Sequence, residues 1–312
     1  MTLGKVAEHA GVALDTARRA LRNEPSVRPY IRERVLNAAE QLDYSPNLIA
    51  RALRDNKVSL IPISVSPFNQ HYFGMLSFGF ANRLVGIGME PALCYDSEHM
   101  LRLCKSFRTR ACLLADGTRK ELIVELAQKR KLITVNGQYP ELSAGNVALD
   151  FDRAYRKLTQ RLLDDGRRRI AIISGVYVYA VKMKWPKDKF PVVLRMLKKE
   201  GLSLAGGDVF GSPSEFAAWL KESGKKVDAV LCEEDLTAAT LIGEMARMGL
   251  RTPEDILVVG CDANLPMPGA WSVKLDTEVI SGMAVDLLRK ALESDAPLEP
   301  VVYKPEVIET TI

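Results

Sequence analysis

The chain has few of the side chains that most often carry catalysis or bind metals. Its three histidines, His9, His71 and His99, are scattered, and its five cysteines form no C-x-x-C pair. Unpaired cysteines in apolar runs indicate buried free thiols rather than a zinc site or a disulfide framework. No phosphate-binding loop, metal-ligand spacing or G-x-S-x-G motif occurs. We therefore expect neither a cofactor nor a metal.

The sequence also lacks long apolar runs and repeats. No stretch approaches the roughly twenty apolar residues needed to span a membrane, and the first residues contain no apolar signal region. We expect a cytoplasmic protein without a membrane partner. Internal repeats and coiled-coil heptads are missing, which argues against a solenoid. With 312 residues, 47% of them hydrophobic, the chain is long enough for more than one domain.

One acidic run needs separate consideration. The carboxylates at 233–235 would suit acid–base or glycosidase chemistry, which uses paired acids. Nothing in the sequence supplies a nucleophile with a partner base. We therefore expect a protein that is not an enzyme.

The start of the chain contains apolar residues at helical spacing. Apolar residues recur at helical spacing over 3–10, Gly11 follows, and a second pattern covers 14–22. A tight glycine-containing turn between two short helices is typical of the helix-turn-helix, whose second helix enters the major groove of DNA. A third pattern, 29–43, would close a small core with apolar residues that include Leu36.

Positive charge is concentrated in this part of the chain. The formal net charge of +4 is only mildly basic for a chain of this length. Local clustering of cations nevertheless favours attraction to phosphates. The clustered cations are Arg18, Arg19, Arg22, Arg28, Arg32, Arg34, Arg51, Arg54 and Lys57.

A more specific signal comes from the order of residues in this segment. It runs Val6-Ala7, Ala10-Gly11-Val12, Thr16, Arg19, Leu21, Asn23, Pro25, Val27, Arg32, Val35 and then Tyr44-x-Pro46-Asn47-x-x-Ala50-Arg51-x-Leu53. This order resembles the lactose-repressor (LacI) family of bacterial transcription regulators. The resemblance implies a repressor that binds a pseudo-palindromic DNA operator as a homodimer and responds to a small molecule.

The resemblance also implies which residues contact DNA. Leu14, Asp15 and Arg19 match base-reading positions, and an arginine can form a bidentate pair with guanine. Thr16, Asn23 and Asn47 match phosphate-contacting positions, whereas Ala50 and Leu53 match a hinge helix at the minor groove. Arg18 stands where the family usually has serine; it either adds a phosphate contact or lies on a solvated face. The full set is Leu14, Asp15, Thr16, Arg18, Arg19, Asn23, Asn47, Ala50, Arg51 and Leu53.

Beyond residue 58, apolar strands alternate with amphipathic helices. Strands are predicted at 59–65, 89–94, 111–115, 132–135, 146–149, 169–174, 229–232 and 256–259, with helices between them. Continuous apolar strands in such an alternation indicate parallel sheets covered on both faces. The resemblance implies a two-lobed core like that of periplasmic binding proteins. Its matching motifs are Asp164-Asp165-Gly166-Arg167-Arg168-Arg169-Ile170-Ala171, Glu234-Asp235-Leu236 and Pro253-Glu254-Asp255-Ile256.

These patterns divide the chain into parts. We expect a helix-turn-helix domain at 1–45, a hinge helix at 46–57 and an effector-binding core at 58–312. The first lobe of the core would comprise about 58–165 and 278–297. The second lobe would comprise about 166–274 and 300–312.

The effector should bind at the carboxyl ends of the parallel strands. The candidates are Phe68, Tyr72, Asn136, Asp150, Lys189, Glu234, Asp235, Asp262 and Asp276. Asp262 matches the sugar-binding aspartate of the family, whereas Asp150 and Asp235 would also serve as helix N-caps. A sugar or sugar derivative is the expected effector.

Two departures from the family concern this site. Glu234 stands where asparagine is common, and Lys189 takes the place of an arginine. A standard neutral hexose is therefore not expected; either the ligand differs or the regulator is insensitive to ligands. The alternative function is a sugar-sensing module with degenerate regulation. The sequence leaves open whether the ligand acts as an inducer or a corepressor, and whether the protein is a dimer or a tetramer.

Overall fold

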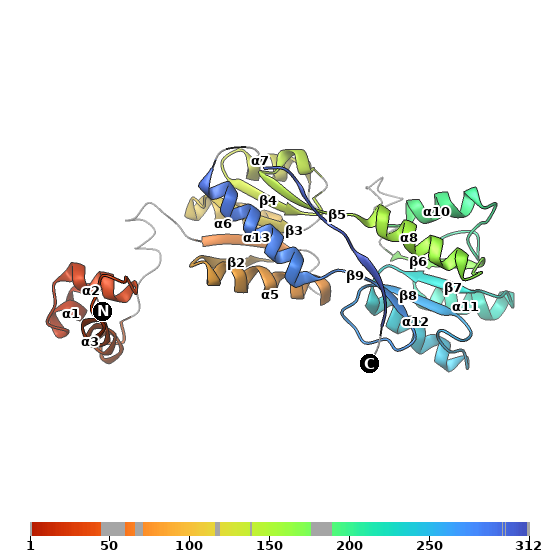
Figure 1. The fold of residues 1–312 in the computed structure, drawn as a ribbon, viewed down its shortest axis with the longest axis horizontal. Helices are drawn as coiled ribbons and strands as arrows, with labels where there is room; N and C mark the ends of the chain where they lie inside the picture. The colour runs from red at the N-terminus through yellow and green to blue at the C-terminus, as the bar shows by residue number, and fades with distance from the viewer. Residues whose placement is uncertain are drawn as a thin grey trace. The chain divides into compact units, whose positions relative to one another are not determined.

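The chain folds into two compact units, which are considered one at a time. The computed structural model describes residues 2–44, 60–65, 71–115, 119–137, 139–175, 189–294, 296 and 298–310 (Figure 1). The units are Met1–Ser59 and Leu60–Ile312. The expected hinge helix at 46–57, with Asn47, Ala50, Arg51 and Leu53, and the effector candidate Phe68 lie outside the described residues.

The amino-terminal unit contains three helices, α1 (Leu3–His9), α2 (Leu14–Leu21) and α3 (Pro29–Gln41). The Thr2 side chain accepts a hydrogen bond from the Lys5 amide at the start of α1, and Pro29 occupies the first turn of α3. Gly11, between α1 and α2, has a φ of +58°, a conformation that residues with a β-carbon rarely adopt. The predicted helix-turn-helix is confirmed.

Small side chains make the core of this unit. Its buried residues are Val6, Ala7, Ala10, Ala17, Ala20, Val27, Val35, Ala38 and Ala39. Leu36 was expected in this core, but it is 48% exposed. The buried face of α3 follows Val35, Ala38 and Ala39, and the next residue after Val35 lies about 100° around the helix.

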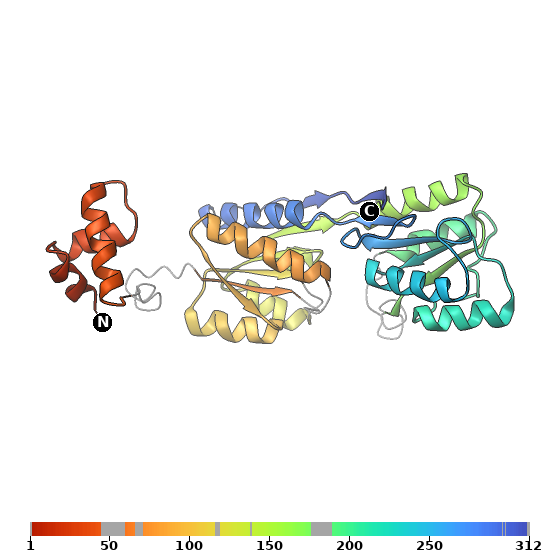
Figure 2. The same cartoon turned by 90° about the horizontal axis from the view of Figure 1, so that it is seen from below.

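The first sheet of the second unit is entirely parallel. Its order is β10-β5-β4-β3-β1-β2. The strands are β1 (Leu60–Val65), β2 (Glu90–Cys94), β3 (Ala111–Ala115), β4 (Lys131–Val135), β5 (Gly145–Leu149) and β10 (Val301–Tyr303). Helices α5 (His71–Gly86) and α13 (Thr277–Glu293) cover one face, and α6 (Ser97–Phe107) and α7 (Lys120–Ala127) cover the other (Figure 2). A short 3-10 helix, Pro140–Leu142, precedes β5.

The second sheet has the order β11-β9-β8-β7-β6, in which only the β11–β9 pair is antiparallel among the described strands. Its strands are β6 (Ile170–Ile173), β7 (Ala229–Cys232), β8 (Leu257–Asp262), β9 (Trp271–Lys274) and β11 (Glu306–Glu309). The helices of this lobe are α8 (Phe151–Asp164), α10 (Phe190–Lys199), α11 (Pro213–Ser223) and α12 (Asp235–Arg247). The expected two-lobed α/β core is confirmed.

The chain passes between the sheets three times, after β5, after β9 and after β10 (Figure 1). This differs from the expected lobe boundaries in two ways. Helix α8 was placed in the first lobe, but it packs on α10 and β11, because its aromatic face meets Phe190 through Tyr155. The final strand region was placed wholly in the second lobe. Instead, Val301 pairs with Val147 in the first sheet, and only β11 joins the second.

The cysteines agree with the prediction, whereas one strand was missed. All five cysteines are buried free thiols, as the sequence indicated. Strand β9 was not predicted. It contains Trp271, which is 7% exposed and packs beneath the Arg161 guanidinium, 3.8 Å from the ring centroid.

Within the described ranges, no helix combines the length and the apolar character needed to cross a membrane.

Candidate functional site

The second helix of the amino-terminal unit exposes a polar face. Ala17 and Ala20 of α2 are buried in the small core, so the opposite side of the helix is left to solvent. Leu14, an apolar residue, is 47% exposed at the start of this helix, and Asp15 beside it is exposed as well. An exposed leucine among polar neighbours is suited to an apolar contact with a base, such as a thymine methyl group.

The arginines of α2 are oriented by bonds within the unit. Arg18 Nη1 lies 2.8 Å from Asp15 Oδ1. Arg19 donates from Nε to Glu24 Oε2 at 3.1 Å and from Nη2 to the Ser26 hydroxyl. Exposed pairs of this kind contribute little to stability, but they hold the guanidinium groups in a defined direction. Thr16 is half-buried on the same helix, and Asn23 follows it with a φ of +56°.

Two other arginines of the basic segment bind backbone carbonyls instead. Arg34 donates to the carbonyls of Ala10 and Gly11 at 2.8 and 3.0 Å. Arg32 donates to the carbonyl of Glu24 at 2.7 Å. These arginines satisfy carbonyls around the turns that flank α2. They therefore position the second helix, in addition to contributing positive charge.

In the second unit, polar side chains meet at the carboxyl ends of β7 and β8. We call them the Lys189–Asp262 cluster; it comprises Tyr72, Lys189, Glu233, Glu234 and Asp262. Lys189 Nζ donates to the carbonyl of Glu233 at 2.7 Å and lies 3.3 Å from Glu233 Oε1. The Ser174 hydroxyl, directly after β6, donates to the Glu233 carboxylate. Strand ends in parallel sheets bring together residues that are far apart in the sequence, as they do here.

Asp262 is the last residue of β8 and has a φ of +105°. Burial raises the pKa of its carboxyl to about 7; the Lys189 ammonium opposes this shift, and Asp235 and Glu234 add to it. Burial likewise raises the pKa of Glu234. For Lys189, burial would lower the pKa, but the surrounding groups, led by Cys261 and Glu233, more than offset this effect and raise it.

Tyr72 brings the first lobe to the cluster. It lies in the first turn of α5, is 7% exposed, and its hydroxyl has no hydrogen-bond partner among the described residues. Burial raises the pKa of this hydroxyl, and the Asp262 carboxylate adds to the shift. A buried hydroxyl without a partner is costly and is suited to a ligand or a water molecule.

Three other candidates from the sequence have local structural roles. Asp150 and Asp276 are the N-caps of α8 and α13, where their side chains accept from the amides of Arg153 and Val279 at 3.1 Å each. Asp235 is 2% exposed and does not cap its own helix. Its oxygens accept from the Ser272 hydroxyl at 2.7 Å and the Asn264 amide at 2.8 Å, which ties α12 to the loop after β8.

The remaining candidate, Asn136, follows β4 with a φ of +51° and is exposed. The structure therefore brings together Tyr72, Lys189, Glu234 and Asp262. The backbone amide of Asn136 donates to the carbonyl of Val147 in the neighbouring strand at 2.8 Å. Glu233 and Ser174 were missed as members. Their positions directly after strands were a usable signal, but a strand pattern does not tell which residue of the run 233–235 turns toward the cluster.

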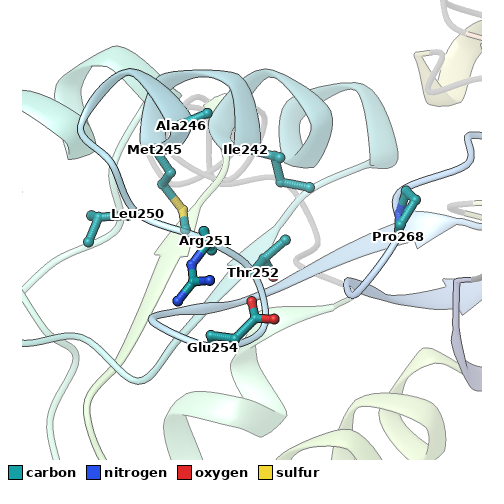
Figure 3. A pocket seen from close by; sticks show the side chains of 8 residues that line it. All are labelled: Ile242, Met245, Ala246, Leu250, Arg251, Thr252, Glu254 and Pro268. Carbon is teal, nitrogen blue, oxygen red and sulfur yellow. The ribbon is translucent and has the colours of Figure 1, made fainter.

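A pocket of about 350 Å³ lies elsewhere in the second lobe (Figure 3). It is lined by Ile242, Met245, Ala246, Leu250, Arg251, Thr252, Glu254 and Pro268. Most of these residues come from the end of α12 and the turn that precedes β8. Asp262 is at the other end of that strand, about 20 Å away at the usual rise per residue. The pocket is therefore separate from the Lys189–Asp262 cluster.

Comparisons with known proteins agree with this arrangement. The family model of bacterial regulatory proteins of the lacI family matches residues 2–47, and that of the periplasmic binding protein-like domain matches residues 159–310. Catabolite control protein A of Priestia megaterium is 24% identical over 331 residues, which cover 99% of this chain and 98% of that protein.

Solved structures share the fold over the full length. A lac repressor dimer bound to operator and the anti-inducer ONPF superposes with a TM-score of 0.79 at 18% identity, covering 100% of this chain and 98% of that one. A complex of the transcriptional regulator CelR with cellobiose gives a TM-score of 0.64 at 23% identity, covering 99% of each chain. With its helix-turn-helix unit and two-lobed core, the chain belongs to the lacI family of bacterial regulatory proteins, which are DNA-binding transcription regulators.

Proposed function

We propose that this protein is a repressor that binds a pseudo-palindromic operator as a homodimer, and that a sugar or sugar derivative at the Lys189–Asp262 cluster sets its affinity for DNA. The observation that supports the DNA-binding part is the exposed face of α2: Asp15 and Arg19 lie on the side opposite buried Ala17 and Ala20, and Leu14 is 47% exposed at the start of the helix. A helix with one buried and one exposed face can enter the major groove of DNA without disturbing the core of its unit. Its target is DNA, so we place the protein in the bacterial cytoplasm.

Within this proposal, the residues of the amino-terminal unit divide by role. Leu14, Asp15 and Arg19 read bases, and Thr16, Arg18 and Asn23 contact phosphates. The oriented guanidinium of Arg19 supports its role, because a bidentate pair with guanine needs a fixed direction. Asn47, Ala50, Arg51 and Leu53 would add contacts from the hinge segment.

The proposed dimer has a candidate surface on the first lobe. Helix α5 exposes Met75, Phe78 and Val85, and the edge strand β2 exposes Leu93. Exposed large apolar side chains on a helix and on the neighbouring edge strand of a sheet are suited to contact with a second copy of the chain. A dimer places two α2 helices on two half-sites, which makes operator symmetry mirror protein symmetry.

The effector part of the proposal rests on the position of the cluster. Tyr72 belongs to the first lobe, whereas Lys189, Glu234 and Asp262 belong to the second. A small molecule that contacts both sides would favour one relative arrangement of the lobes, and such coupling between ligand and DNA is typically worth about 1–3 kcal/mol. We assign the protein no catalytic role and no cofactor.

The test is a DNA-binding measurement on the full-length protein. Fragments selected from the genome should share a two-fold symmetric site, and a duplex with that site should bind at least a hundredfold more tightly than a scrambled one. Phe78→Asp should convert the dimer to a monomer in light scattering and abolish tight operator binding. Equal affinity for scrambled DNA would contradict the repressor role and favour a sensing module without site-specific recognition.

A further inference from the structure

We propose that the ligand of the Lys189–Asp262 cluster carries a protonated amine, as an amino sugar or another amine-bearing polyol does, rather than being a neutral sugar or a sugar phosphate. This inference rests on the proposed function, because it names the ligand class for the same site.

The cluster contains more acidic than basic side chains. Glu233, Glu234 and Asp262 belong to the cluster, and Asp235 adjoins it, whereas Lys189 is its cation. The ammonium of Lys189 is already engaged by Glu233, through the carboxylate at 3.3 Å and the backbone carbonyl at 2.7 Å. Little of that positive charge is left for an anionic ligand.

Two of these four carboxylates have hydrogen-bond donors within the protein. Glu233 has Lys189 and the Ser174 hydroxyl, and Asp235 has the Ser272 hydroxyl and two amides of the following loop. For Glu234 and Asp262, by contrast, no ion pair is formed in the part of the chain that the structure describes. These two partly buried carboxylates thus have only a share of the Lys189 ammonium among the described residues, whereas buried charges are normally paired directly.

A buried hydroxyl adjoins these acids. The hydroxyl of Tyr72, on the first lobe, is buried and has no hydrogen-bond partner among the described residues, and the Asp262 carboxylate of the second lobe contributes to its raised pKa. An ammonium group offers three donors and no acceptor. It would bond to the two carboxylates and to the phenolic oxygen at once, whereas a phosphate would bring a further −1.5 to −2 of charge next to them.

The pKa of Asp262 supports the same ligand class. Burial raises it to about 7, and the groups that face this carboxyl are Lys189, Glu234, Asp235, Cys261 and Tyr72. A bound cation favours the ionised carboxylate and would lower this pKa. Binding of an amine should therefore release a proton and tighten as the pH rises from 5.5 to 7, a range in which such amines remain mostly protonated.

The experiment is calorimetry on the full-length protein with matched pairs of probes. The pairs are Tris with 1,1,1-tris(hydroxymethyl)ethane, glucosamine with glucose, and galactosamine with galactose; glucose 6-phosphate is the anionic probe. We expect the amine of at least one pair to bind at least tenfold more tightly than its neutral partner, and more tightly at pH 7 than at pH 5.5. The inference is overturned if neutral or phosphorylated probes bind as well as the amines, or if no probe binds.

Two variants and a control locate the effect. Glu234→Gln and Asp262→Asn should each reduce the preference for the amine at least fivefold. Glu244→Gln, on the exposed side of the same helix α12 and paired with Arg247 at 2.7 Å, should leave it unchanged. Thermal melting verifies that each variant folds. If both cluster variants retain the full preference, the amine does not bind these carboxylates.

Operator binding separates this inference from the proposed function. A neutral sugar that binds and changes operator affinity would uphold regulation and overturn the amine ligand. An amine that binds as predicted without changing operator affinity would uphold the ligand class and overturn the regulatory role of the site.

Discussion

Gly79 of α5 lies so close to Ser281 of α13 that a β-carbon at position 79 would be 2.5 Å from Ser281 Oγ. Ser281 is fully buried, and Arg83, one turn further along α5, donates to its hydroxyl at 3.2 Å. The chain enters α13 directly after leaving the second sheet. The contact therefore joins α13, the segment that returns from the second lobe, to helix α5 of the first lobe.

Gly79→Ala should lower the free energy of unfolding of the core by about 1–3 kcal/mol, because neither helix can move away without disturbing its packing. Gly74 is the matched control: it lies on the same helix, and a β-carbon there would meet nothing within 4 Å. Gly74→Ala should be neutral or stabilising by about 0.5–1 kcal/mol. Urea denaturation followed by circular dichroism checks both, and equal effects would argue against the close contact.

Arg19→Ala should weaken operator binding by about 1–3 kcal/mol and relax the base preference at one position of each half-site. The reason is that a guanidinium held by Glu24 and Ser26 is directed for bidentate pairing. Selection of bound sequences with the variant gives the measurement. Arg102→Ala removes an exposed cation from helix α6 of the second unit and should change neither the operator affinity nor the base preference. A binding-site profile identical to that of the parent protein would remove Arg19 from the base-reading set.

Asp262→Asn should change how the stability of the core depends on pH. An aspartate in an unfolded chain has a pKa of about 3.9, and that of Asp262 in the folded protein is about 7. Because the folded state holds the proton more tightly, this group stabilises the fold fully below pH 4, and the contribution is lost as the pH rises to 7. The asparagine variant does not titrate there.

The measurement is the free energy of unfolding of Asp262→Asn minus that of the parent protein. We expect this difference to rise between pH 4.5 and pH 7.5 by an amount on the order of 2 kcal/mol and then to level off. A difference that stays constant with pH would mean that Asp262 titrates at its ordinary value.

Asp235→Ala should destabilise the second lobe by about 3 kcal/mol or more, since it leaves the buried Ser272 hydroxyl and two loop amides without their acceptor. Asp276→Ala, which removes a helix N-cap, should cost about 1 kcal/mol. Thermal denaturation compares the two variants. If Asp235→Ala destabilised the protein no more than Asp276→Ala, the buried hydrogen bonds of Asp235 would contribute less to stability than their geometry suggests.

The local parts of this fold could be predicted because short-range patterns produce them. The glycine at position 11, the proline at 29 and the buried alanines of α2 predicted the helix-turn-helix without any long-range information. Continuous apolar strands such as β3 predicted parallel, doubly covered sheets. The residue order from Val6 to Leu53 indicated the family.

Assignments that depend on partners distant in sequence could not be made in the same way. Helix α8 follows a strand of the first sheet, yet Tyr155 packs on Phe190 in the second lobe, and a helical pattern carries no information about which sheet it covers. Likewise, Asp235 and Glu234 are adjacent acids, but Asp235 accepts a hydrogen bond from Ser272, whereas Glu234 forms no ion pair with another described residue.

The sequence by itself determined the helix-turn-helix, the two-lobed parallel-sheet core and the family, since hydrophobic periodicity and turn residues act over a few positions. Only the tertiary structure decided which carboxylates are satisfied internally, that Lys189 is paired with Glu233, and that the Tyr72 hydroxyl is buried without a hydrogen-bond partner among the described residues. These relationships arise where strand ends from two sheets converge, and the charge and burial of each group depend on neighbours that the local sequence does not specify.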